Sequence, residues 1–188
     1  MNVIAIHSSN RPDGLSARLA AAVLEGAGAA GASTELVSLN DLHIETCQAC
    51  PPAGWGQCRA GQDCVLEDDF QGLRAKIVAA DALVFVTPVY FWDLSESAKR
   101  FLDRLRRAEW PRRDSSPLRA KPVVGIAAAG GSGTGAVPAI ANLERYMTYL
   151  QMQHVVYLPV SRQNQALQIK AAREAGAFLA AQATAASG

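Results

Sequence analysis

The stretch VIAIHSSNRPDGLS, residues 3–16, decides the fold that we expect for this chain. Its apolar run, Val3–Ile6, is typical of a buried strand, and a helical pattern follows from Leu15 to Ala30. The first turn of a helix presents unpaired N–H groups and partial positive charge. A strand, loop and helix in this order are therefore suited to binding an anion.

The polar loop inside this stretch carries further groups that suit phosphate. Ser9 and Ser16 supply hydroxyl donors, Arg11 supplies a planar guanidinium, and Gly14 lets backbone come close to a ligand. The alternative is an ordinary strand-to-helix loop in which small polar residues cap the helix and Arg11 is solvated. The loop is neither a Walker A loop nor GxGxxG, so it lacks the two commonest nucleotide-binding fingerprints.

Length and composition predict one globular domain over residues 1–188. Hydrophobic residues make up 49% of the chain and charged residues 19%, which excludes a disordered protein. The chain contains eighteen basic and seventeen acidic residues, so its net charge does not favour nucleic acid or an acidic membrane as a partner. The sequence shows no membrane-span pattern and no signal peptide pattern, and we therefore expect a cytoplasmic protein without a membrane partner.

The order of patterns along the chain predicts an α/β fold of three layers, with five parallel strands and helices on both faces of the sheet. Strands are expected at residues 3–6, 35–39, 82–86, 122–127 and 154–158. Helices are expected at residues 15–30, 68–80, 94–107, 137–150 and 162–180. The glycines Gly26, Gly28 and Gly31 suit the end of the first helix. The alanine-rich tail, residues 181–188, is expected to fray.

Three loops of unusual composition follow the first, third and fourth strands. They are residues 8–16, 87–92 and 128–135. Ligands of such sheets bind outside the carboxyl ends of the strands, so we expect the three loops to meet at one edge.

The second and third loops suggest how a ligand is held there. Aromatic residues beside Pro88 can pack on a flat ring, or they cover the core or a dimer contact. The glycine-rich third loop lets backbone approach a ligand, or it is a mobile connector. Together with a phosphate loop, these features describe a mononucleotide with a planar ring, and flavin mononucleotide (FMN) fits.

All four cysteines fall in the long loop formed by residues 40–66. The spacing Cys47-x2-Cys50-x7-Cys58-x5-Cys64 permits a 4Fe-4S cluster or a zinc site. Long loops inside compact domains are usually functional. The alternative is that no metal binds, because the insertion at Pro51–Gln57 pulls Cys58 out of range. We leave cluster, zinc and no metal open.

Several segments resemble the flavodoxin-like NAD(P)H-dependent FMN reductase family, near its iron–sulfur flavoprotein branch. They are SSNRPDGLS (8–16), CQAC (47–50), CVLEDDF (64–70), ADA (80–82), TPVYF (87–91) and KRFLDR (99–104). The chain departs from the family at three positions. Ser8 stands where the family usually has glycine, Leu15 where it often has asparagine, and Trp92 where it commonly has glycine.

The resemblance implies a sheet of order 2-1-3-4-5, bound FMN, NAD(P)H as electron donor, and a homodimer or homotetramer. It also implies which residues contact FMN. The phosphate would be held by Ser9, Arg11, Gly14, Leu15 and Ser16. The ring would be bordered by Thr87, Pro88, Val89, Tyr90, Phe91 and Trp92, with Ala129, Gly130, Gly131 and Ser132 at its other edge.

We therefore expect an oxidoreductase that passes electrons from NAD(P)H through flavin to a quinone, a flavin or a similar small acceptor. The flavin would carry the chemistry, so no catalytic side chain is named. The alternatives are an electron carrier between proteins, with flavin and an iron–sulfur cluster, and a binding protein with a degenerate site. No Ser-His-Asp set and no paired carboxylates appear, so hydrolysis is not supported.

Overall fold

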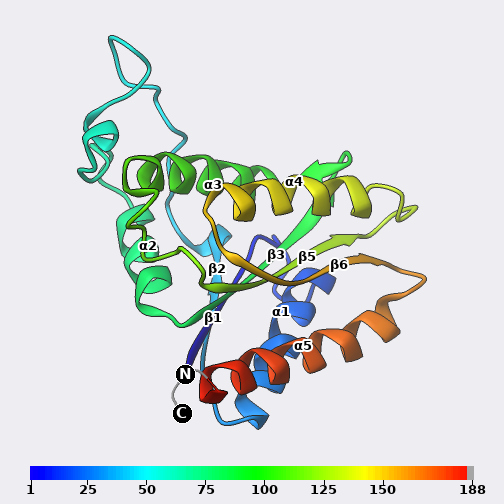
Figure 1. The fold of residues 1–188 in the computed structure, drawn as a ribbon. Coiled ribbons are helices and arrows are strands. Elements are labelled where there is room, and N and C mark those ends of the chain that lie inside the picture. The colour runs from blue at the N-terminus through cyan, green and yellow to red at the C-terminus, as the bar shows by residue number, and fades with distance from the viewer. Residues whose placement is uncertain (186–188) are drawn as a thin grey trace.

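The structure is a computed structural model and describes residues 1–185 of the chain. Strands and helices alternate along it, as the sequence predicts (Figure 1). The strands are β1 (Asn2–His7), β2 (Ser33–Ser38), β3 (Ala82–Tyr90), β4 (Asp93–Leu94), β5 (Pro122–Ala129) and β6 (Gln153–Ser161). The helices are α1 (Leu15–Ala29), α2 (Phe70–Ala79), α3 (Glu96–Glu109), α4 (Ala136–Tyr149) and α5 (Gln165–Ala185). Short 3-10 turns are η1 (Leu39–Asp41), η2 (Gln57–Ala60) and η3 (Trp110–Arg112).

Five strands pair in parallel in the order β2-β1-β3-β5-β6. Without the two-residue strand β4, this is the predicted order 2-1-3-4-5, and the flavodoxin-like topology is confirmed. Strand β1 lies between β2 and β3, where Ile4 pairs with Glu35 on one side and Leu83 on the other. The carboxyl ends of β1, β3 and β5 therefore lie along one edge of the sheet.

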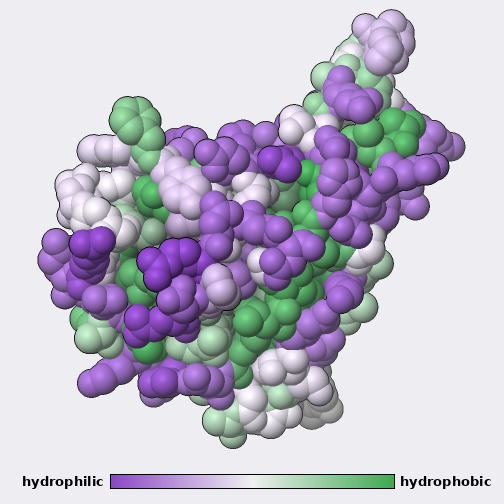
Figure 2. All heavy atoms as spheres, turned by 180° about the vertical axis from the view of Figure 1, so that it is seen from behind, coloured by the Kyte–Doolittle hydropathy of each residue, from purple (hydrophilic) through white to green (hydrophobic). Residues whose placement is uncertain are grey.

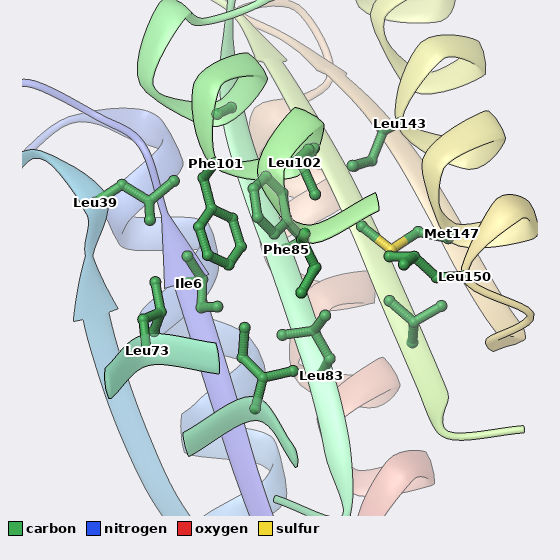
Figure 3. Packing of buried hydrophobic residues seen from close by; sticks show 14 of the residues in the cluster. Ile6, Leu39, Leu73, Leu83, Phe85, Phe101, Leu102, Leu143, Met147 and Leu150 are labelled. Carbon is green, nitrogen blue, oxygen red and sulfur yellow. The ribbon is translucent and has the colours of Figure 1, made fainter. Parts of the chain in front are cut away.

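Helices cover both faces of the sheet, which gives the predicted three layers. Helices α2, α3 and α4 pack on one face, and α1 and α5 pack on the other (Figure 1). Figure 3 shows the first of these cores, where the Phe85 ring of β3 stacks on Phe101 of α3 with centroids 6.4 Å apart. Neighbouring residues of β3 alternate between the two cores from Ala82 to Val86, so this part of the strand is apolar because both of its faces are buried.

Three details differ from the sequence prediction. Strand β3 continues to Tyr90, so most of the expected loop 87–92 is extended strand, and β4 pairs antiparallel with its end. Helix α5 continues to Ala185, beyond the expected end at residue 180, while residues 186–188 of the tail expected to fray lie outside the described chain. Helix α1 runs through Gly26 and Gly28, and the helix stop is Gly31, with φ of 88°.

Gly26 lies where α1 crosses α5, and this crossing leaves no room for a side chain. A Cβ atom at Gly26 would lie 1.9 Å from the Arg173 carbonyl oxygen of α5, and one at Gly176 would lie 1.9 Å from the Val23 carbonyl oxygen of α1. The two helices thus touch backbone to backbone. Within residues 1–185, no helix combines the length and the apolar character needed to span a membrane.

Candidate functional site

The first loop ends at a helix terminus that is open to an anion. Gly14 is the N-cap of α1. Within the described chain no side chain caps this helix, and its first turn carries no acidic residue. A Cβ atom at Gly14 would lie 2.7 Å from Ser9 Oγ and 3.0 Å from the Arg11 carbonyl oxygen. Gly14 therefore fits closely against its own loop, while the approach to a ligand that the sequence analysis expects of it stays a prediction. The terminal N–H groups keep their partial positive charge.

Local hydrogen bonds shape the loop before that helix. Ser9 Oγ donates to the Arg11 carbonyl (2.9 Å) and accepts from the Arg11 N–H (3.2 Å). The Ser9 N–H donates to His7 Nδ1 (3.3 Å), and burial lowers the pKa of His7, partly opposed by the charge of Asp41. A depressed pKa favours the neutral imidazole that can accept this bond.

Ser16 and Arg11, two of the residues expected to bind phosphate, differ in exposure. Ser16 is buried in the first turn of α1. The Arg11 guanidinium is 76% exposed and pairs with Asp13 at 3.0 Å. An arriving phosphate would therefore compete with the Asp13 carboxylate for Arg11.

A buried serine network joins the first loop to β3 and α3. Ser95, the N-cap of α3, donates through Oγ to Ser8 Oγ (2.8 Å), and its own N–H donates to Thr87 Oγ1 (3.1 Å). Sequence analysis missed Ser95. The available signal was a serine directly before Glu96, at the start of an amphipathic helix, which is a typical N-cap pattern.

The three loops meet at one edge of the sheet, as predicted. Asn10 of the first loop donates to the Tyr90 hydroxyl at 3.4 Å. A Cβ atom at Gly135, the last residue of the third loop, would lie 2.9 Å from Val89 Cγ1 and 3.1 Å from Trp92 Cα. The first loop therefore touches the second, and the second touches the third.

The tip of the second loop is a strained turn. Phe91 and Trp92 both have positive φ, 46° and 70°, between the antiparallel partners Tyr90 and Asp93. Two such residues in a two-residue hairpin loop form the turn type that normally contains Asn-Gly. The turn exposes 98% of Phe91 and 54% of Trp92. Strained backbone that presents aromatic rings at a ligand edge is typical of functional positions.

Replacing Trp92 with glycine is expected to give a more stable protein than replacing it with alanine, by about 1 kcal/mol, because glycine adopts positive φ without strain. Both variants lose the indole ring, so the difference in their free energies of unfolding reports the cost of positive φ at this position. Urea unfolding of the two variants measures it. Equal stability would show that the positive φ of Trp92 stores no strain.

The third loop lies where the sequence places it. Ala129 is buried at the end of β5, whereas Gly130, Gly131 and Ser132 are exposed. Added Cβ atoms at Gly130 and Gly131 would meet nothing within 4 Å among the residues described. Ser132 Oγ lies 2.9 Å from Thr134 Oγ1. Bare backbone is therefore available at this end of the edge.

The cysteine loop stands out from the body of the molecule as a lobe (Figure 2). Cys47, Cys58 and Cys64 line one small cavity of about 20 Å³ beside α3. Cys50 is placed elsewhere, against Gly56, where an added Cβ would lie 3.0 Å from its Sγ. Over residues 1–185 all four thiols are free, and no group of three or more Cys, His, Asp or Glu is arranged to hold a metal ion. Three of the four thiols thus border one cavity, but the described residues do not bring them together as a metal-binding group.

The strand order defines a flavodoxin-like α/β protein, and the joined loops lie at the edge where such sheets bind their ligands. Residues 1–165 match the family described as NADPH-dependent FMN reductase, and the chain belongs to that family.

Two curated relatives are iron–sulfur flavoproteins. The chain is 33% identical over 135 residues to one from Methanocaldococcus jannaschii, a match that covers 72% of this chain and 65% of that protein. It is 26% identical over 147 residues to one from Methanosarcina thermophila, covering 78% of this chain and 73% of that one. The chain therefore spans just under two thirds of the first relative's length.

Solved structures show the same fold. An NAD(P)H:quinone oxidoreductase from Methanothermobacter marburgensis superposes with a TM-score of 0.73 at 20% identity, covering 95% of this chain and 96% of that one. At this identity the likeness concerns the fold alone.

Proposed function

We propose that the chain binds FMN at the joined loops and transfers electrons from NAD(P)H to a quinone, a flavin or a similar aromatic acceptor. The observation that carries this proposal is the uncapped N-terminus of α1 beside three touching loops at one sheet edge, within the described residues. Membership of the FMN reductase family supports it. Bound FMN supplies a ring that accepts a hydride from a nicotinamide and hands two electrons to an acceptor.

The chain's own residues would bind and orient the cofactor. The phosphate lies at the α1 terminus, held by backbone N–H groups, by Ser9 and Ser16, and by Arg11 once it leaves Asp13. Residues 87–92 border the ring with aromatic surface, and residues 129–132 approach it with backbone. The serine network at Ser95 fixes the first two loops relative to one another.

The site is tested by titrating the purified chain with FMN and measuring binding from the quenching of flavin fluorescence. Gly14→Ala is expected to weaken FMN binding about tenfold or more, because the new methyl group overlaps Ser9 Oγ and displaces the loop. Gly72→Ala on α2 is the matched control, since its Cβ meets nothing within 4 Å over the described residues. Equal affinity of the two variants, or no FMN uptake by the natural sequence, would contradict the proposal.

Electron donors distinguish the enzyme from a carrier. Anaerobic bleaching of the bound flavin by NADPH or NADH is expected for the enzyme. Bleaching only by a reduced ferredoxin would favour the second candidate, a flavin and iron–sulfur electron carrier. That candidate draws support from the three thiols that share a cavity and from the relatives named iron–sulfur flavoproteins.

Thiolates are the ligand type of iron–sulfur clusters, although the described residues do not arrange these thiols as a metal-binding group. Four thiols lie in one loop, and two buried guanidinium N–H groups, at Arg104 and Arg107, lack an acceptor among residues 1–185. Cys47, Cys50, Cys58 and Cys64 are the residues that would hold a cluster.

We also propose a homodimer or homotetramer, since Phe91, Trp92 and Val137 expose apolar surface. Light scattering measures the assembly.

A further inference from the structure

A cavity of about 330 Å³ lies beside the first loop, between the first turns of α1 and the carboxyl end of β2. Its volume is in the range of small-molecule sites. Ser9, which precedes the N-terminus of α1, is one of its lining residues, so the cavity adjoins the expected phosphate site. A ligand with a phosphate at that terminus therefore has space to extend toward β2.

The cavity has apolar walls because α1 presents small side chains to it. Ala17 and Ala21, one helical turn apart, both line it. Pro12 of the first loop and the exposed side chain of Leu36 in β2 add apolar surface. Ligand sites generally combine such walls with a few polar groups that fix the orientation of the ligand.

Three polar side chains at the cavity keep unused hydrogen-bonding capacity. His7 is 5% exposed, and its Nδ1 accepts from the Ser9 N–H, so the neutral ring carries its proton on Nε2. That Nε2–H has no acceptor in residues 1–185. The Asp41 carboxylate and the Arg18 guanidinium also line the cavity, and neither forms a hydrogen bond or ion pair in the described part of the chain. Nearly buried donors are usually satisfied, so His7 indicates an acceptor that the chain itself does not supply.

The positions of these groups suit the adenosine half of a dinucleotide. In dinucleotide-binding α/β folds the pyrophosphate lies at the N-terminus of the first helix, and a carboxylate further along the same βαβ unit binds the ribose hydroxyls. Here Asp41 lies just past the end of β2, which pairs with β1. Arg18 lies in the first turns of α1, where a guanidinium can bind phosphate oxygens.

We propose that this cavity binds the adenosine of FAD, with the pyrophosphate at the N-terminus of α1 and the flavin ring at the joined loops. The inference rests on the proposed flavin site and extends it by the AMP half of the cofactor. Asp41 accepts from the ribose hydroxyls, His7 donates to an oxygen or nitrogen of the nucleoside, and Arg18 pairs with the pyrophosphate. FMN reaches only the ring site and the phosphate site, so it leaves Asp41 and His7 without a partner.

Isothermal titration calorimetry of the full chain with FAD and, separately, with FMN tests the inference. The natural sequence is expected to bind FAD about tenfold more tightly than FMN. Asp41→Ala is expected to lower the affinity for FAD about tenfold, because the ribose hydroxyls lose a charged acceptor. Ala21→Leu fills the cavity and is expected to abolish the preference for FAD. Ala29→Leu, at the exposed far end of α1 and outside the cavity lining, is the matched control and should keep the preference.

Each outcome decides the inference. Equal affinities of the natural sequence for FAD and FMN would overturn it and leave the FMN site in place. A preference for FAD that survives both Asp41→Ala and Ala21→Leu would also overturn it, because the adenosine would then lie elsewhere. Competition between AMP and NADPH on the FMN-loaded chain, without a preference for FAD, would assign the cavity to the nicotinamide donor instead. If the chain bound neither flavin, the proposed function and this inference would fall together.

Discussion

Replacing Asp68 with alanine is expected to lower the free energy of unfolding by about 3–5 kcal/mol, the range for breaking a buried ion pair. The Asp68 and Arg104 side chains are 1% and 2% exposed and pair through both carboxylate oxygens. Asp68 also accepts from the backbone N–H groups of Glu45 (2.7 Å) and Phe70 (3.2 Å). Its removal leaves a buried cation and two donors without acceptors. Urea unfolding measures the loss.

Asp13→Ala is the control for the Asp68 prediction. It breaks an ion pair with Arg11 whose side chains are 76% and 73% exposed, so stability should not change. A loss for Asp68→Ala no larger than that for Asp13→Ala would show that the buried pair contributes nothing net.

The Asp68 prediction has a pH dependence with a definite sign. Burial acts to raise the pKa of Asp68, but the hydrogen bonds from Arg104 and from two backbone N–H groups outweigh it, and the pKa is lowered. A carboxyl whose pKa is depressed in the folded state makes its full contribution to the free energy of unfolding above its ordinary pKa of about 3.9. That contribution is lost as the pH falls from there through the folded-state pKa. The difference between the natural sequence and Asp68→Ala should therefore be constant near neutral pH and shrink below about pH 4.

Replacing Gly176 with alanine is expected to lower the free energy of unfolding by about 3 kcal/mol, at the upper end of the range for overpacked sites. The new methyl group would overlap the Val23 carbonyl oxygen of α1, and backbone cannot rotate away as a side chain can. Helices α1 and α5 would have to separate along their crossing. Thermal and urea unfolding measure the loss.

Gly28→Ala on α1 is the matched control for the helix crossing. The nearest atom to its new Cβ would be Thr34 Cγ2 at 4.0 Å, so alanine should be neutral or stabilising there. Gly26→Ala should resemble Gly176→Ala. The double variant should lower the free energy of unfolding by less than the sum of the two single losses, because both substitutions separate the same pair of helices. Additive losses would contradict a shared crossing.

Most of the architecture was predictable because its signals are local. Strand β3 is apolar from Ala82 to Val86 since both faces are buried there, and α3 shows the spacing of an amphipathic helix. The alternation of such segments fixes a parallel sheet, and the parallel sheet brings the loops after β1, β3 and β5 to one edge. The first loop, the aromatic tip and the glycine loop were all located in this way, and their contacts with a ligand stay predictions.

The failures came from residues whose partners lie far away in the chain. Gly26 suits a helix stop as well as a helix crossing, and only the position of α5 decides between the two. The short strand β4 was missed because it forms only when β3 runs on to Tyr90 and the chain turns back at Phe91 and Trp92.

Local sequence patterns were enough to predict the order of the strands and helices along the chain, the edge where ligands are expected, and the four thiols in one loop. Periodicity and composition carry that information because each depends on neighbouring residues. Which thiols share a cavity, and that Arg104 and Arg107 border it, follows only from the three-dimensional packing. Those contacts span some 40 to 60 residues, and they depend on how α3 is rotated on the sheet, which local pattern does not specify.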